Sequence, residues 1–189
     1  MTTLLIAEHD NNNISDSVRK AITAAQSIGE QIDILVAGKD CNSVADEAAK
    51  ISGVTKVLVC DNEIYSKHLA EPYADLIVSL SGDYNTFIAP ATTTSKNYMP
   101  RVAALLDVPQ VSDIISVIDS QTFEHPIYAG NAIETVKLLS EKKVITVRAT
   151  AFQASEDQEP VDIVAIDSAS NPGLSEYISE ELTESDRPE

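Results

Sequence analysis

The 189-residue sequence predicts an α/β fold, in which helices cover both faces of a parallel sheet and an antiparallel β extension follows. Two observations predict it. Short apolar runs alternate four times with segments of helical periodicity up to residue 106. After Pro109, β-rich runs follow one another too closely for helical crossovers. Because the first four strands are apolar on both faces, they are typical of a Rossmann-like parallel sheet.

The elements of the parallel part can be placed in order. Residues 3–8 form an apolar run that predicts the first strand. A helix follows, because Ser15 or Asp16 can cap its start and apolar residues recur at three- and four-residue steps as far as Gly29. The further expected elements are strands at 32–37, 56–60 and 86–89 and helices at about 42–52, 69–80 and 98–106. Pro72 and Pro100 are both expected in a first helical turn, where no N–H is needed.

The second part of the chain is rich in short β-type runs. They lie at 113–119, 123–128, 134–139 and 143–147, and we expect them to pair largely as antiparallel strands. Residues 161–166 indicate an edge strand and residues 175–182 a short helix. The expected organisation is an α/β domain over 1–148, with the β extension from about residue 110, and an acidic linker or tail over 149–189.

Charge limits the classes of partner. The net charge of −17 argues against nucleic acid and anionic membrane surfaces, which both require clustered Lys and Arg. Residues 150–189 hold eleven acidic side chains and one basic one, a balance of −10, whereas residues 1–149 hold nineteen and twelve, a balance of −7. We therefore expect the tail to be solvated and extended by its own repulsion.

The chain has no apolar run of membrane-spanning length, and its start lacks the basic flank and cleavage-type segment of a signal peptide. We expect a cytoplasmic protein with no direct membrane insertion.

Two cysteines in different elements, Cys41 and Cys60, suggest free thiols and neither a disulfide framework nor a zinc site. His68 and His125 lack companions at ligand spacing, so no metal site is expected.

The glycines do not form a phosphate-binding loop. A nucleotide fingerprint places several glycines between a strand and a helix, and none of the six glycines here has that context. Gly29, Gly53 and Gly82 each follow a run of helical periodicity, and we expect them to end helices at positive φ. The sequence thus predicts the framework of a nucleotide-binding fold without a recognisable phosphate-binding loop.

Ligands of open parallel sheets bind beyond the carboxyl ends of the strands. After the first strand, Glu8, His9 and Asp10 are either an acid/base pair or solvated loop residues, and we favour the second because adjacent side chains on an extended segment point apart. The loop 90–97 offers four hydroxyls, Lys96 and a helix start, which suit either a phosphate or helix capping. We favour capping. No catalytic, cofactor-binding or metal-binding residue is assigned.

Four residues are candidates for a partner interface. Arg101 lies in an otherwise apolar helical stretch, where a buried guanidinium needs a carboxylate or a partner. Tyr128 and Asn131 flank a turn that either serves only as a tight hairpin or presents a polar corner to another protein. With Asn97, these residues form the expected interface.

Several motifs resemble one family, the alpha subunit of electron transfer flavoprotein. They are residues 95–106 (SKNYMPRVAALL), 109–115 (PQVSDII), 127–132 (IYAGNA) and 143–148 (KVITVR), with LIAEH at 5–9 and LVAG at 35–38. Together they cover the whole length of the chain. The sequence departs from the pattern at Ser95, where we expect the family to favour glycine.

The resemblance implies a heterodimer of alpha and beta subunits that carries one FAD. Such a heterodimer takes electrons from acyl-CoA dehydrogenases of fatty acid β-oxidation and other flavoenzymes, and passes them to a membrane-bound quinone reductase. It also implies an adenine nucleotide alpha hydrolase-like fold, shared with the beta subunit. The family's FAD-binding motifs belong to a second domain, which we expect beyond residue 189, so no flavin contact is assigned to this chain and FAD is expected only in the full-length protein.

Two other interpretations stay open. A free-standing adenine-nucleotide-binding module of the universal-stress-protein kind has a similar framework, but the absent glycine loop argues against it. A hydrolase that uses Glu8 and His9 lacks a recognisable nucleophile.

Overall fold

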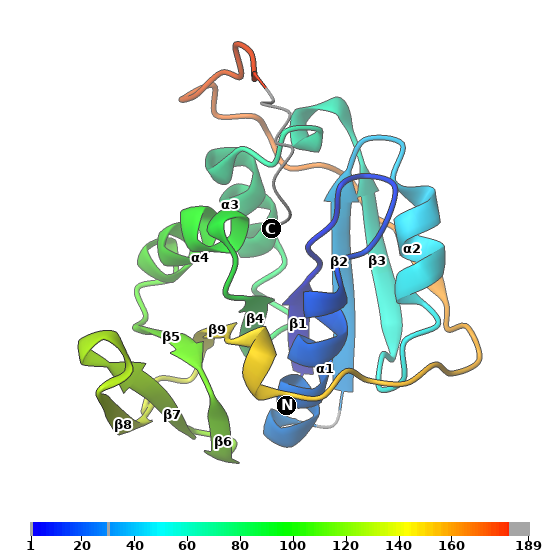
Figure 1. The fold of residues 1–189 in the computed structure, drawn as a ribbon. Coiled ribbons are helices and arrows are strands. Elements are labelled where there is room, and N and C mark those ends of the chain that lie inside the picture. Colours follow the sequence, from blue (N-terminus) through cyan, green and yellow to red (C-terminus); the bar gives the residue numbers. More distant parts are fainter. Residues whose placement is uncertain (1, 30, 182–189) are drawn as a thin grey trace.

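A computed structural model describes residues 2–29 and 31–181 of the chain. A seven-stranded sheet with the order β10-β3-β2-β1-β4-β9-β5 forms its centre, and every neighbouring pair in it is parallel (Figure 1). A three-stranded antiparallel sheet, β6-β7-β8, lies beside it. The predicted fold class is confirmed.

The strands of the large sheet are β1 (Thr2–Ile6), β2 (Gln31–Gly38), β3 (Lys56–Asp61), β4 (Thr86–Pro90), β5 (Gln110–Ile114), β9 (Lys143–Val147) and β10 (Ile163–Ala165). The small sheet contains β6 (Ser116–Asp119), β7 (Thr122–Ile127) and β8 (Ala132–Lys137). The helices are α1 (Asp16–Ile28), α2 (Asn42–Ala48), α3 (Ala70–Ser79) and α4 (Thr93–Leu105). Single 3-10 turns occur at η1 (Glu63–Tyr65), η2 (Tyr128–Gly130) and η3 (Ala149–Ala151).

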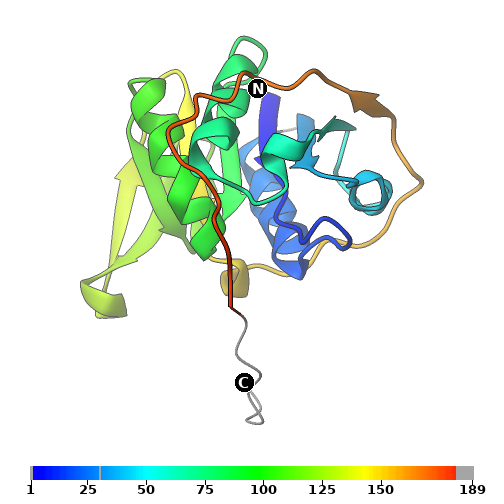
Figure 2. The same ribbon diagram turned by 90° about the horizontal axis from the view of Figure 1, so that it is seen from above.

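Two apolar layers bury the faces of the large sheet. Alternate residues of a strand point to opposite faces, so Leu5 joins the core under α1 and α2, while Leu4 joins the core under α3 and α4. Figure 2 shows these helix pairs from above, with the strands between them. Because both faces of these strands are buried, their sequences are unbroken apolar runs.

The start and end of α1 show which local signals decide a helix boundary. Ser15 caps the helix as predicted, because its hydroxyl accepts a hydrogen bond from the Ser17 N–H at 3.3 Å. The prediction that Gly29, Gly53 and Gly82 end helices at positive φ was wrong, because α2 ends at Ala48, before Gly53, and the other two lack positive φ. Gly53 has a φ of 95°, whereas Gly29 has a φ of −162° and Gly82 is not among the described residues of positive φ. Gly29 therefore ends α1 in extended backbone.

Helix α4 starts earlier than predicted, at Thr93 rather than at Tyr98. Thr92 and Ser95 form a capping box, in which each side chain bonds to the other residue's backbone N–H. Pro100 consequently lies inside the helix and not in its first turn, which corrects that prediction. Residues 93–97 are weak helix formers, and the cap rather than their propensity starts the helix. In contrast, α2 ends at Ala48, before the predicted end at residue 52.

The predicted antiparallel pairing of residues 143–147 was wrong. This segment is β9, and it inserts between β4 and β5 in the large sheet with parallel pairing on both sides. The chain leaves the large sheet after β5, builds the small sheet and then returns as β9 (Figure 1). The predicted strand 113–119 is accordingly split between the two sheets. Asp113, with a φ of 60°, turns the chain there, and its carboxylate accepts a hydrogen bond from Arg148 Nε at 3.1 Å.

The segment after β9 lies on the α/β body as a strap, which we define as residues 149–166. Thr23 donates to the carbonyl of Gln153 at 2.8 Å, and Arg19 pairs with Asp157 at 2.8 Å. The predicted edge strand is confirmed as β10, which pairs with β3. Figure 2 shows the strap, coloured from yellow to orange, running around the side of α1 and α2. The first half of the expected linker is therefore bound to the body, and the domain boundary at 148 stays a prediction.

The helix expected at 175–182 is absent from its described part, residues 175–181. The side chains bond to the body instead, because Ser175 donates to Glu71 at 2.6 Å and Lys67 pairs with Glu180 at 3.3 Å. Ile178 is 81 % exposed, so no buried stripe supports a helix here. Helices this short are marginal in water without such packing. Residue 182 lies outside the described residues.

Replacing Gln158 tests the strap. Its amide accepts from the Gly53 N–H at 3.1 Å and donates to the Val54 carbonyl at 2.9 Å. We expect Gln158→Ala to lower the free energy of unfolding by about 1–2 kcal/mol, since two half-buried backbone groups lose their partner. Gln153→Ala, which changes an exposed side chain on the same strap, is the control. Equal urea midpoints for the Gln158→Ala variant and the wild type would show that the strap is not held in this way.

Candidate functional site

The carboxyl ends of β1, β2 and β4 form the edge where a ligand was expected. Glu8, just after β1, accepts a hydrogen bond from the Thr92 hydroxyl at 2.5 Å. This contact ties the loop after β1 to the start of α4. Asp10 stays on the surface, where its carboxylate accepts from the N–H groups of Asn12 and Asn13 at 2.8 Å and 2.6 Å. Glu8 and Asp10 thus serve loop structure.

His9 turns away from Glu8 into the interior, as the extended geometry predicts. Its ring is 7 % exposed and lies 5.0 Å from the His68 ring, nearly perpendicular to it. Nδ1 accepts from the Asn11 N–H at 3.1 Å, and Nε2 has no partner among the described residues. Burial lowers the pKa of His9 to about 4, and it also lowers the pKa of His68. Both rings are therefore neutral at pH 7, and Glu8 and His9 do not form an acid/base pair.

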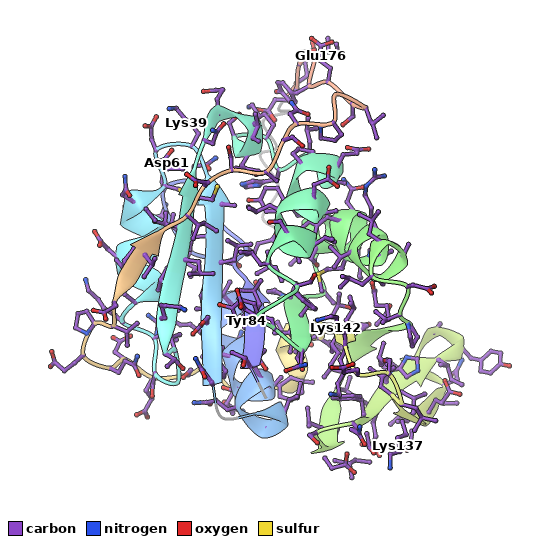
Figure 3. The ribbon with its side chains drawn as sticks, turned by 180° about the vertical axis from the view of Figure 1, so that it is seen from behind. Lys39, Asp61, Tyr84, Lys137, Lys142 and Glu176 are labelled. Carbon is purple, nitrogen blue, oxygen red and sulfur yellow. The ribbon has the colours of Figure 1, made fainter. Side chains whose placement is uncertain are left out.

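Gly38 at the end of β2 makes this packing possible. A Cβ at this position would lie 2.3 Å from Asn11 Oδ1 and 2.8 Å from His9 Cε1. Asn11 Oδ1 instead accepts from the N–H of Lys39 at 3.0 Å. Figure 3 labels Lys39 beside Asp61 at this edge of the sheet. The close approach of backbone and side chains, rather than a phosphate, explains the glycine.

Tyrosine rings fill the space below this loop. The Tyr73 hydroxyl donates to the carbonyl of Ala37, and the Tyr73 ring lies 5.3 Å from Tyr98 and 5.5 Å from Tyr65. Burial raises the pKa of Tyr65 to about 12 and that of Tyr73 well above its ordinary value. These buried hydroxyls stay protonated at neutral pH. Side chains of the chain itself thus occupy the region between β1, β2, α3 and α4.

Two of the four hydroxyls of the loop 90–97, those of Thr92 and Ser95, serve as caps, which is the role that we favoured. Ser95 is fully buried, and its hydroxyl contacts the carbonyl of Pro90 as well as the Thr92 N–H. Beside this loop lies an open pocket of about 640 Å³, lined by Lys67, His68, Thr93, Thr94, Lys96 and Asn97. Lys67 is already engaged, since it pairs with Glu180 and lies 4.4 Å above the Tyr177 ring centre.

The predicted interface residues fall into two separate pairs. Asn97 and Arg101 are one turn apart on α4, where Asn97 is exposed and the buried Nε of Arg101 has no partner among the described residues. Tyr128 and Asn131 lie at the tip of the small sheet, and Asn131 Nδ2 donates to the Tyr128 carbonyl at 3.0 Å. Figure 1 places this tip, between β7 and β8, away from α4. The structure therefore does not bring the two pairs together.

The described residues contain no group of three or more His, Cys, Asp or Glu side chains that could hold a metal ion. Cys41 and Cys60 are buried free thiols, as predicted, and burial raises the pKa of Cys41 to about 11. Within the same part of the chain, no helix has both the length and the apolar character needed to cross a bilayer.

We did not predict a buried polar cluster that lies at the opposite edge of the sheet, near the amino-terminal ends of the strands. Asp33 on β2 has a side chain that is 1 % exposed, and it accepts from the Tyr84 hydroxyl at 2.7 Å and from Lys56 Nζ at 3.1 Å. Figure 3 labels Tyr84 well below Lys39 and Asp61. A single Asp inside the apolar run 32–37 was the available signal, because a buried carboxylate requires partners.

Removing the α4 cap tests the structural role of the hydroxyls. Thr92→Ala deletes one half of the capping box and the bond to Glu8, and we expect it to cost about 1–2 kcal/mol of stability. Thr93→Ala changes an exposed hydroxyl at the next position and is the control. Denaturant unfolding of both variants gives the comparison. A smaller loss for Thr92→Ala than for Thr93→Ala would contradict the capping role.

His9 predicts a pH dependence of stability. Its folded pKa of about 4 lies below the value of 6.5 expected when unfolded, so the unfolded chain binds the proton first. Stability from this group is complete above pH 6.5 and declines between pH 6.5 and 4, by about 2 kcal/mol at pH 5. His9→Gln should flatten the urea midpoint between pH 7.5 and 5 relative to the wild type. Identical pH profiles for wild type and His9→Gln would refute this assignment.

The chain matches the electron transfer flavoprotein domain over residues 3–171. It is 47% identical to the electron transfer flavoprotein subunit alpha of Paracoccus denitrificans and 53% identical to that of Bradyrhizobium diazoefficiens. The mitochondrial electron transfer flavoprotein subunit alpha of Dictyostelium discoideum is 44% identical. Each alignment covers 100% of this chain but only 61%, 60% and 58% of the relative, so the chain spans about 60% of the length of these curated relatives. The fold, the motifs and these similarities agree: the chain belongs to the electron transfer flavoprotein domain family.

Proposed function

We propose that this chain is the N-terminal scaffold domain of an electron transfer flavoprotein alpha subunit. It packs against a beta subunit and supports a following FAD-binding domain. The full heterodimer carries electrons through FAD from acyl-CoA dehydrogenases and other flavoenzymes to a membrane quinone reductase, and it works in the cytoplasm. One observation of the structure supports this assignment above the others: side chains of the chain itself fill the carboxyl edge of the sheet.

The bonding of the loops at the carboxyl edge argues against a flavin held by the described residues. The cap hydroxyls of Thr92 and Ser95 are bonded within the loop, and Gly38 is packed against His9 and Asn11. FAD supplies the redox chemistry where it is bound, and protein provides its orientation and shielding. The contribution of this chain is therefore positional, and we assign the flavin to a segment beyond it.

The acidic segment provides the connection to that domain. The strap is bound to α1, to the residues that follow α2 and to β3, which sets the path of the chain around the body. Residues 167–181 then cross to α3, where Ser175 and Glu180 bond to Glu71 and Lys67. The first half of this segment thus acts as a fixed spacer, and any hinge for a flavin domain lies after it.

Exposed apolar side chains support a partner surface on the small sheet. Tyr128 is 80 % exposed, and Ile118 and Ile133 are 56 % and 60 % exposed. Soluble proteins that expose several large apolar side chains on one element commonly use them to bind a partner. With Asn131 they form one part of the proposed interface, and Asn97 and Arg101 on α4 form the other.

One observation favours a second candidate function, an adenine-nucleotide-binding module. The 640 Å³ pocket lies at the start of α4 and has Lys67 and Lys96 in its lining, as a phosphate site would. This candidate predicts ATP or AMP binding by the isolated chain. The scaffold assignment predicts none, because Lys67 is paired with Glu180 and the loop hydroxyls are used as caps.

Complex formation with the beta subunit of the same organism tests the proposal. We expect the purified chain and the beta subunit to elute together in size-exclusion chromatography, with a light-scattering mass that corresponds to a one-to-one complex. A complex that persists at high salt agrees with an apolar interface, because salt screens only charge. Separate elution at micromolar concentration would count against the scaffold role.

A further inference from the structure

The β7–β8 hairpin extends beyond the support of the body. Its base is packed, since Phe123 is fully buried and Leu138 is 5 % exposed. Its outer half, which we call the arm (residues 125–134), begins at the paired side chains of His125 and Glu134 and contains no buried residue. Figures 1 and 2 both show the hairpin projecting from the molecule. A two-stranded ribbon without a core is only marginally stable in water.

The tip of the arm has an unusual backbone. Tyr128, Ala129 and Gly130 have φ values of 50°, 55° and 89°, so three consecutive residues are in the left-handed region. This conformation is unfavourable for the two residues that carry a Cβ. Asn131 holds it, because its backbone N–H and its Nδ2 donate to the Tyr128 carbonyl at 3.2 Å and 3.0 Å. The result is a fixed turn that presents the Tyr128 ring to solvent.

The arm is also depleted in charge. Residues 126–133 contain no Asp, Glu, Lys or Arg, although the chain has a net charge of −17. Tyr128 is 80 % exposed and Ile133 is 60 % exposed. The centres of protein interfaces are poor in charged residues and rich in aromatic ones, and Tyr is among the commonest hot-spot residues. The uncharged part of the arm, residues 126–133, with a tyrosine at its tip has the composition of an interface centre.

The chain's own downstream segment lies on another side of the body. Ser175 and Glu180 bond to Glu71 and Lys67, next to α3. In Figure 1 this segment, coloured orange-red, lies at the top, whereas the small sheet lies at the lower left. The described path of the chain after β10 therefore runs away from the arm, which leaves the arm for another polypeptide.

We infer that the arm is the anchor of the complex, with the Tyr128 ring inserted into an uncharged apolar pocket of the beta subunit and its hydroxyl bonded at the pocket's edge. This inference rests on the proposed function, which supplies the partner. The fixed turn reduces the ordering cost of binding, because the ring is already displayed in the unbound chain. Affinity is then concentrated at one residue.

Substitution of Tyr128 tests the inference by calorimetric titration of the 189-residue chain with the beta subunit. Tyr128→Ser should weaken binding at least tenfold, while Tyr128→Phe, which keeps the ring, should stay within about threefold of the wild type. Ile178→Ser is the matched control, since Ile178 is 81 % exposed and lies on the downstream segment. It should bind like the wild type. Thermal unfolding of the four proteins should coincide, because the altered side chains are exposed.

The outcomes distinguish two cases: the chain does not bind the beta subunit, or it binds without Tyr128 as the anchor. If the wild-type chain does not bind the beta subunit, the proposed function itself fails. If the wild type binds and Tyr128→Ser binds equally well, the partner relation stands and the anchor is overturned. Sedimentation of the chain alone tests whether the arm instead binds a second copy of this chain. If the wild type forms a dimer that Tyr128→Ser dissociates, while binding to the beta subunit is unchanged, the arm is a homodimer contact. That result also overturns the inference.

Discussion

Close packing at the end of β2 determines how the loops and rings at the carboxyl edge of the parallel sheet are arranged. This packing is possible because Gly38 has no side chain, which leaves room for Asn11 and His9 against the end of β2. Once His9 is buried, His68 and the tyrosine layer pack beneath it, and the Tyr73 hydroxyl reaches the carbonyl of Ala37. Several polar groups that an α/β protein usually turns toward a ligand, among them Glu8, Thr92 and Ser95, are here bonded within the chain.

The start of α4, at the same edge of the sheet, is also bonded within the chain. A helix N-terminus attracts anions because its first N–H groups lack partners. In α4 the capping box supplies a partner for the Ser95 N–H, and Glu8 adds a negative charge at the cap through its bond to Thr92. The surfaces that remain available for recognition lie elsewhere, on the projecting arm and on the exposed side of α4.

The sequence predicted the four βα units well, because runs such as 32–37 and 56–60 carry the signal of strands buried on both faces. It did not place β9, since an apolar run such as 143–147 has the same composition in parallel and antiparallel pairing, and only the path of the chain through the small sheet decides. The pairing of His9 with His68 was equally hidden, because residues so distant in sequence meet only through the fold. The start of α4 was missed because its cap, not the propensity of residues 93–97, begins the helix.

The central claim is that this chain positions partners and does not itself hold a nucleotide or flavin. Calorimetric titration of the purified 189-residue chain with FAD and, separately, with AMP measures this most directly. We expect no heat of binding for either compound up to near-millimolar concentration, since the capping hydroxyls are bonded within the chain and Lys67 is paired with Glu180. Saturable binding of either compound with a micromolar Kd would contradict it.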